Sequence, residues 1–225
     1  MLATDGEPVR QTIHVDGQRT VFEIRSQHPP SALFGDPDVN LFRQLATDEI
    51  PPTVNSLKAA QSVSVVISTQ AANSGEAIAR RFARAMGIDR LAIYAEADLT
   101  GIDLASGDTL FVGIPAQGLP RGLFPRVTTE DGENIRLGEA VVSPDQQVLF
   151  IVNRQPDHPD RLVALLQPGS PDATEEAIIK IPHYGRYSYL AFMDGRNPLK
   201  GTWENKTSPL TVRWPPPTVQ ERNDE

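Results

Sequence analysis

The sequence Ser62-Val63-Ser64-Val65-Val66-Ile67 decides the fold class, because its β-branched residues predict a strand and a helix follows it directly. The helix is expected to begin with a capping-box-like start at Asn73-Ser74-Gly75-Glu76 and to end at Gly87, which suits a left-handed C-terminal position. Its apolar residues recur at a spacing of four: Ile78, Phe82 and Met86. Its arginines face elsewhere: Arg80, Arg81 and Arg84.

More strands are expected downstream of this helix. Arg90–Tyr94 and Asp108–Gly113 are near-continuous apolar runs, typical of strands that are covered on both faces of a sheet. An antiparallel section is then predicted in three segments: Asn134–Val142, Gln147–Val152 and Arg161–Leu166. Turns are expected at Asp131-Gly132 and Pro144-Asp145.

A second helix and a last central strand complete this part of the chain. The helix begins at Ser170-Pro171-Asp172, which offers an N-cap, a proline at the first helical position and a carboxylate in the first turn, and it ends at Pro182. Tyr187–Phe192 is the strand, followed by a turn at Asp194-Gly195. The alternation of strands and helices with antiparallel segments predicts an α/β fold, a three-layer sandwich with a mixed sheet over residues 61–214.

The N-terminal residues 1–30 are expected to form a small β-hairpin appendage, a β-rich remnant that precedes the sandwich. Val9–Ile24 shows two alternating runs on either side of Asp16-Gly17, a pair typical of a type I′ turn with positive φ at both residues. Residues 31–60 form a proline-rich connector, in which Asp38–Leu45 is a candidate short helix. Residues 215–225 are predicted to be a flexible tail.

Composition excludes several functional classes. The 225 residues are 39% hydrophobic and 22% charged, as in a globular protein, and the net charge of −8 argues against binding nucleic acid or an anionic membrane surface. Without cysteine there is no disulfide, no thiolate zinc site and no cysteine nucleophile. No export signal and no apolar run of ~18 residues is found, so no membrane insertion is expected. No cofactor is predicted, and the localisation stays open.

The segment Lys180–Phe192, the tyrosine-rich junction, holds three of the four tyrosines where the second helix meets the last strand. Two interpretations stay open. In the functional one, four residues form the rim of a recess at an edge of the sheet and meet an anionic group: His183, Tyr184, Arg186 and Tyr187. In the structural one, Pro182 ends the helix, Gly185 supplies a positive φ, and the tyrosines seal the core.

The loop Ser68–Gly75 joins the first strand to its helix, where backbone amides favour anions. It has one glycine and lacks the spacing of the known phosphate-binding loops, so an ordinary loop is preferred. Ser74 lacks the Gly-x-Ser-x-Gly elbow of a serine nucleophile. The acidic segments are interpreted as solvated loops: Asp98–Asp108 and Asp157–Asp160.

Two pairs of segments carry a family resemblance: Asp36–Arg43 with Glu49–Thr53, and Ile181–Leu190 with Lys200–Trp203. They resemble the region downstream of the catalytic domain in bacterial membrane-alanine-aminopeptidase-like metallopeptidases of the gluzincin family, and Asn153–Leu166 is also similar. The resemblance implies a C-terminal accessory segment of a larger protein, with a β-rich remnant followed by an α/β module. If that parent protein is exported, the module is extracytoplasmic, in the cell envelope.

The zinc motif of that family is missing. It needs two histidines one helical turn apart, whereas His14, His28, His158 and His183 are all further apart in the sequence. We therefore assign no catalytic and no metal residue, and expect a non-catalytic accessory and interaction module whose partner is an upstream catalytic domain or another protein. Two alternatives stay open: a binding module for cell-envelope polymers or proteins, and a small stand-alone α/β hydrolase or nucleotide-binding enzyme.

Overall fold

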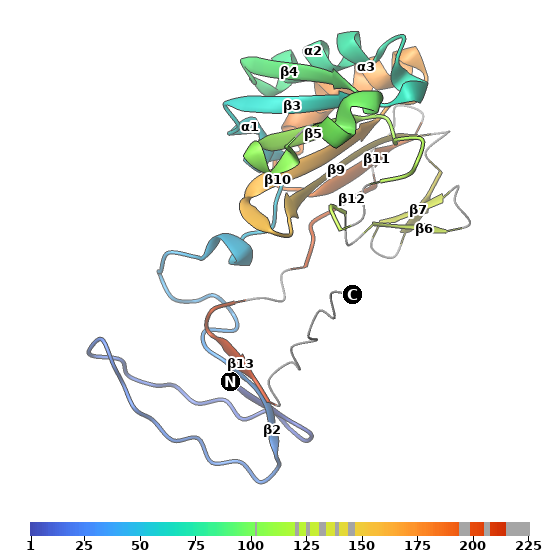
Figure 1. Cartoon of the computed structure of the whole chain (residues 1–225). Helices are drawn as coiled ribbons and strands as arrows, with labels where there is room; N and C mark the ends of the chain where they lie inside the picture. The colour runs from blue at the N-terminus through green and yellow to red at the C-terminus, as the bar shows by residue number, and fades with distance from the viewer. Residues whose placement is uncertain are drawn as a thin grey trace, which may run out of the picture. The chain divides into compact units, whose positions relative to one another are not determined.

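The computed structural model describes residues 1–101, 103–119, 122–124, 127–130, 134–137, 140–143, 147–193, 199–204 and 208–214. The chain divides into two compact units, which are shown in Figure 1. Unit 1 comprises Met1–Glu49 and Lys206–Glu225, and unit 2 comprises Ile50–Asn205. The long middle segment of the chain is therefore one unit, and the two ends of the chain form the other.

Unit 2 is built on a mixed β-sheet. Over the described residues it has seven strands: β3 (Ser62–Ile67), β4 (Arg90–Ala95), β5 (Asp108–Val112), β9 (Val148–Gln155), β10 (His158–Gln167), β11 (Tyr189–Phe192) and β12 (Leu199–Gly201). Their spatial order is β12-β11-β9-β10-β5-β3-β4. The neighbours β10, β5, β3 and β4 pair in parallel, whereas β9 is antiparallel to both β10 and β11. The predicted mixed sheet is confirmed.

Helices cover one face of this sheet: α1 (Val54–Lys58), α2 (Gly75–Met86), α3 (Pro171–Lys180) and the short η5 (Ile181–His183). The other face carries η3 (Glu96–Gly101), η4 (Leu104–Ser106), and a small antiparallel sheet of β6 (Val127–Glu130), β7 (Asn134–Leu137) and β8 (Ala140–Val142) (Figure 1). Phe82 packs on Phe150 on the helical face, and Phe111 packs on Phe124 on the other. The α/β sandwich predicted from the sequence is therefore confirmed.

The two long helices follow from their sequences. Phe82 and Met86 of α2 are buried, and Gly87 ends the helix with φ of 75°. The expected capping box is wrong, because among the described contacts the Ser74 side chain makes no cap hydrogen bond. In α3 the N-cap prediction is confirmed, since the Ser170 hydroxyl accepts a hydrogen bond from the backbone N–H of Ala173.

Strand β4 is more exposed than its apolar sequence predicts. It lies at the edge of the sheet and pairs with β3 alone among the described strands, and Tyr94 is 36% exposed. The predicted run Asn134–Val142 forms two strands, β7 and β8, which belong to the small sheet. The predicted turns at 131–132, 144–145 and 194–195 lie outside the described residues.

Unit 1 contains an antiparallel sheet whose described strands are β1 (Leu2–Thr4), β2 (Pro30–Phe34) and β13 (Thr211–Arg213), in the order β1-β2-β13. The predicted hairpin Val9–Ile24 is wrong. Residues 10–29, all of them described, contain no strand, and Gly17 does not take the positive φ that a type I′ turn needs. Several of its apolar side chains stay in solvent, since Val15 and Val21 are 66% and 83% exposed and have no core to pack on.

The short helix expected at Asp38–Leu45 is also wrong. Asp36 and Val39 both have positive φ, of 48° and 50°, which a helix does not permit. The Asp36 carboxylate accepts hydrogen bonds from the backbone N–H groups of Asn40 and Leu41, so the segment folds as a side-chain-capped turn. Among the described residues of unit 1, the helical structure is the single turn η1 (Thr47–Glu49).

The boundaries of the units differ from those expected from the sequence. The expected connector 31–60 divides at residue 49, because β2 belongs to unit 1 whereas α1 belongs to unit 2. The end of the expected α/β domain also moves, since β13 pairs with β2 and so belongs to unit 1. The expected tail, 215–225, lies outside the described residues.

Candidate functional site

A recess of about 620 Å³ opens at the carboxyl ends of the parallel strands of unit 2. Its wall at the strand ends is made by the residues that follow β3 and β5 and by the last residue of β10: Ser68, Gly113 and Gln167. Helix α2 contributes Ser74, Ala77 and Ile78, and α3 contributes Pro171, Thr174 and Ile178. The recess therefore runs along α2 and α3, from Ser74 to Arg84 on the α2 side, and Figure 1 shows both helices on the same face of the sheet.

The strand order explains why a recess forms at this point. The chain runs from β3 through helix α2 to β4, which pairs with one edge of β3. Strand β5 pairs with the other edge of β3. The chain leaves β3 toward the helical face and leaves β5 toward the opposite face, where β6, β7 and β8 lie. Such a switch point is where ligands bind in open α/β sheets, since the two diverging connections leave a crevice.

The rim of the recess is basic. Helix α2 lines it with three arginines, Arg80, Arg81 and Arg84, and the acidic residue of α3 that lines it is Glu175. Arg81 pairs with Glu175, and Arg80 pairs with Glu76 one turn earlier at 2.8 Å. This concentration of cations occurs in a chain with a net charge of −8, so the recess attracts anions more strongly than the chain as a whole.

Among the described residues, the hydroxyl groups that line the recess belong to Ser68, Ser74 and Thr174. Ser68 is fully buried, and its hydroxyl accepts a hydrogen bond from the backbone N–H of Ala71 at 3.3 Å. None of the four histidines, all of which are described, lines the recess beside Ser74. A serine nucleophile needs a base within hydrogen-bond reach, so this geometry does not favour nucleophilic chemistry.

Glu96 ties together the two loops that diverge at the switch point. One carboxylate oxygen accepts hydrogen bonds from the Thr69 N–H at 2.7 Å and the Thr69 hydroxyl at 2.9 Å, and the other accepts one from the Ala116 N–H at 2.6 Å. Partial burial acts to raise the pKa of Glu96, but the donors from Thr69 and Ala116 outweigh it and the pKa is lowered. Glu96 therefore stays ionised and fixes the loop that carries Ser68 and Gln70.

The tyrosine-rich junction lies at the opposite end of the sheet, because residues 183–188 precede β11, whose direction is that of the parallel strands. His183 and Arg186 are exposed, and Tyr184 and Tyr187 are half-buried. None of these four residues lines the recess. The rings of Tyr184 and Tyr187 pack 6.1 Å apart, with the Lys200 ammonium group 5.2 Å and 5.3 Å from their centroids.

Gly185 has a different role from the one expected. It does not take a positive φ, and a Cβ at this position would overlap the side chain of Asn55 in α1. The backbone carbonyls of Gly185 and Tyr187 accept hydrogen bonds from the N–H groups of Asn55 and Val54. Gly185 therefore lets the junction approach the start of α1 closely, where the first helical amides need acceptors.

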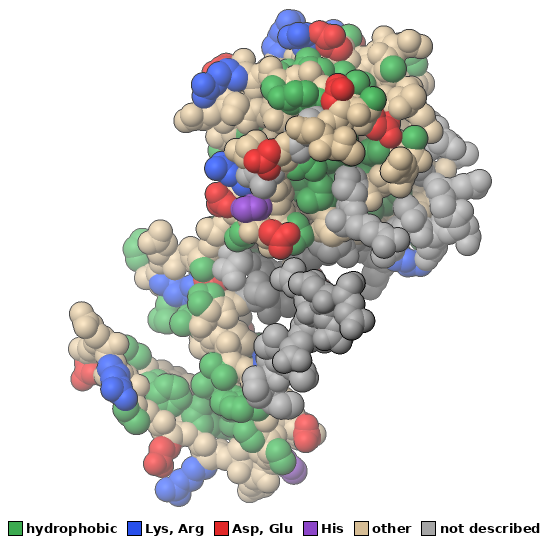
Figure 2. Space-filling model, in the orientation of Figure 1, with side chains coloured by type: hydrophobic (Ala, Val, Ile, Leu, Met, Phe, Trp, Pro, Cys, Tyr) green, Lys and Arg blue, Asp and Glu red, His purple; other side chains and the backbone are tan. Residues whose placement is uncertain are grey.

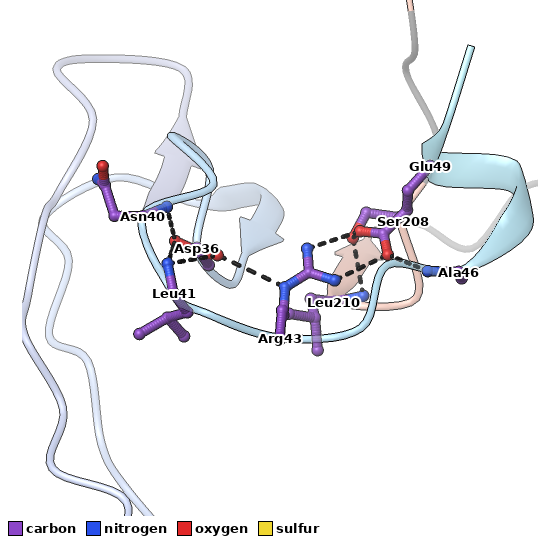
Figure 3. Close-up of polar contacts among 8 residues, drawn as sticks. All are labelled: Asp36, Asn40, Leu41, Arg43, Ala46, Glu49, Ser208 and Leu210. Atoms are coloured by element: carbon purple, nitrogen blue, oxygen red, sulfur yellow. Dashed lines mark hydrogen bonds and ion pairs between the residues drawn. The ribbon is translucent and has the colours of Figure 1, made fainter. Parts of the chain in front are cut away.

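A cluster of charged side chains in unit 1, which we name the clamp, joins Asp36, Arg43, Glu49 and Ser208 (Figure 3). The Arg43 guanidinium binds both oxygens of Glu49, at 2.8 and 2.7 Å, and its Nε lies 3.4 Å from Asp36. The Ser208 hydroxyl donates to Glu49 at 2.6 Å. The Glu49 and Asp36 side chains are only 7% and 5% exposed, so the clamp is largely shielded from water.

The clamp projects an apolar group, which we name the tip, into solvent. Val39 and Leu41 are 56% and 63% exposed, and Phe42 is fully exposed. Figure 3 shows the Leu41 side chain pointing away from the Arg43 guanidinium. Because Asp36 holds the backbone of Leu41 and the side chain of Arg43 on either side of Phe42, the turn is fixed by hydrogen bonds and ion pairs.

The clamp makes unit 1 sensitive to acid. Hydrogen bonds from Arg43, Ser208 and Ala46 lower the pKa of Glu49 to about 2, from its usual value near 4.5. A lowered pKa means that the contribution of Glu49 to stability is complete above pH ~4.5 and is lost as the pH falls toward 2. We expect the amide resonance of Ala46, whose N–H donates to Glu49 at 2.8 Å, to lose its native shift in this pH window, as followed by NMR. In Glu49→Gln it should lack this pH dependence; an unchanged titration in that variant would contradict the assignment.

The comparisons assign no family. A scan against protein-family models finds no match, and a search of curated proteins finds no significant relative. In the part of the chain that the structure describes, no helix is long and apolar enough to cross a membrane, and no group of three potential metal-ligating side chains is found. The function is therefore inferred from the geometry of the recess, the junction, the clamp and the tip.

Proposed function

We propose that the chain is a non-catalytic accessory and interaction module of a larger metallopeptidase-like protein, and that it docks to the catalytic part of that protein through the tip. The observation that carries this proposal is the full exposure of Phe42 on a turn that the clamp holds in place. A large aromatic side chain that is exposed and fixed before binding loses little conformational entropy on docking, which is typical of an interface anchor.

The weak core of unit 1 supports a docking role. Among its described residues, the fully buried apolar side chains are Leu2 and Ala32. Figure 2 shows hydrophobic side chains over its visible face, and Val15, Val21 and Val212 are all strongly exposed. A small sheet with so little buried area is marginal in water, so a partner that covers it contributes to its stability.

The family resemblance supports the choice of partner. The first resembling pair of segments, Asp36–Arg43 with Glu49–Thr53, contains three members of the clamp and the whole tip. The polar residues of this pair of segments, Asp36, Arg43 and Glu49, thus hold the tip in place. In a metallopeptidase of this kind the partner surface is part of the upstream catalytic region, so we place zinc binding and peptide hydrolysis there.

The test begins with the reading frame upstream of Met1, in which we expect a His-Glu-x-x-His motif. The upstream catalytic segment is then produced separately, and its binding to this chain is measured by calorimetry. We expect Phe42→Ala to weaken binding by about tenfold or more, at an unchanged melting temperature.

The matched control for this test is Ile179→Ala. It removes an apolar side chain that is 55% exposed on α3 of unit 2 and belongs to neither the clamp nor the tip. We expect this variant to bind like the unchanged chain. Binding that is the same in Phe42→Ala and in the unchanged chain would overturn the docking proposal, as would an upstream frame without the zinc motif.

A further inference from the structure

We propose that the recess in unit 2 binds a small organic oxyanion, a phosphate ester or a carboxylate with a compact apolar body. The proposal is independent of the docking function, because the recess belongs to unit 2 whereas the tip belongs to unit 1. Its volume of about 620 Å³ falls in the range that small-molecule sites occupy. Its place at the switch point of the sheet is where such ligands bind in α/β domains.

The charge of the recess selects the sign of the ligand. Arg80, Arg81 and Arg84 line it against one lining carboxylate, that of Glu175. The Arg81 guanidinium is held by Glu175, whereas no ion pair is found for Arg84 within the described residues. Arg84 is therefore available for a bidentate contact with a phosphate or carboxylate group.

The start of α2 adds a neutral donor to this basic rim. The Ser74 side chain lines the recess and makes no cap hydrogen bond with the described residues, so its hydroxyl can donate to a bound anion. In the neighbouring turn Thr69–Ala71, the Thr69 N–H already donates to Glu96. This difference directs an anion toward α2 and α3, away from η3.

The remaining lining explains why an organic anion is favoured over a bare ion. Ala77 and Ile78 of α2 and Ile178 of α3 present apolar surface between the arginines and the strand ends. An apolar body that covers these side chains gains about 25 cal/mol per Å² of buried area. The arginines then bind the anionic group, and the aliphatic surface binds the body.

The proposal is tested by NMR titration of the full chain at constant ionic strength. The probes are inorganic phosphate, butyl phosphate and butyrate; the last two carry an apolar body and separate the ester from the carboxylate source. We expect saturable shifts of the amides at residues 74–78, with tighter binding of at least one organic probe than of inorganic phosphate. Arg84→Gln should weaken that binding by about tenfold.

Two further variants separate a binding role from a structural one. Arg186→Gln removes an exposed arginine at the other end of the sheet and should leave binding unchanged. Glu175→Gln releases Arg81 from its ion pair and should tighten binding, which a merely structural role of Glu175 would not produce. The proposal is overturned if no probe gives saturable shifts at residues 74–78, or if Arg84→Gln and Arg186→Gln bind equally well.

Discussion

Replacing Trp203 by alanine is expected to lower the free energy of unfolding of unit 2 by about 3–5 kcal/mol. The indole is 5% exposed and stacks on Tyr189 with ring centroids 4.5 Å apart. Its N–H donates to the Val152 carbonyl of β9 at 2.8 Å. Truncation therefore removes a large apolar side chain from the face opposite the helices and leaves a buried carbonyl with one donor fewer. Urea denaturation followed by circular dichroism measures the loss.

Two controls define the origin of this effect. Trp203→Phe keeps an aromatic ring and removes the N–H donor, so it should lose less than the alanine variant. Trp214→Ala removes a side chain that is 42% exposed in unit 1 and should change the stability of unit 2 by no more than about 0.5 kcal/mol. The assignment of Trp203 to the core fails if Trp203→Ala and Trp214→Ala unfold at the same urea concentration.

Replacing Gly113 by alanine is expected to cost about 2–4 kcal/mol, the second large effect. Gly113 follows β5 with φ of +81°, where a Cβ is strained by about 1 kcal/mol. The added Cβ would also overlap the Ser68 hydroxyl and lie 3.1 Å from its Cβ. Since Ser68 is fully buried it cannot move aside, and overpacking of this kind costs about 1–3 kcal/mol.

Gly118→Ala separates the two contributions. Gly118 has nearly the same φ, +82°, but a Cβ there would meet no described atom within 4 Å. We expect it to cost only the backbone strain, about 1 kcal/mol, in the same denaturation experiment. Equal losses in Gly113→Ala and Gly118→Ala would show that the contact between the ends of β3 and β5 is not tightly packed.

The parts of the fold that follow from neighbouring residues were predictable. Strand β3 and helix α2 were expected near their observed limits, because β-branched residues, helical spacing and the terminal Gly87 are local signals. The hairpin Val9–Ile24 failed because its alternating side chains have no core to pack on, with Val15 and Val21 66% and 83% exposed. The exposure of β4 depends on strand order, which its own apolar sequence does not encode.

The candidate site was predictable only in fragments. The loop Ser68–Gly75 was considered as an anion site, but α3 and the end of β10 complete the recess, and no local pattern joins these segments. The spacing of the arginines in α2 places them away from its apolar face, and the rim function needs the position of α3. Three residues of the clamp, Asp36, Arg43 and Glu49, lie in segments that carry the family resemblance, whereas Ser208 lies in none of them, and their mutual contacts arise from the fold.

The pairing of β2 with β13 makes unit 2 an insertion within unit 1. The chain leaves unit 1 after Glu49 and has returned by Ser208, and the side chains of these two residues are in direct contact. Contacts within unit 1 therefore hold together the two places where the chain leaves unit 1 and returns to it. Residues 50–205 can consequently be exchanged as a module: a short linker, or another domain whose ends lie close together, can replace them while β2 and β13 keep their pairing.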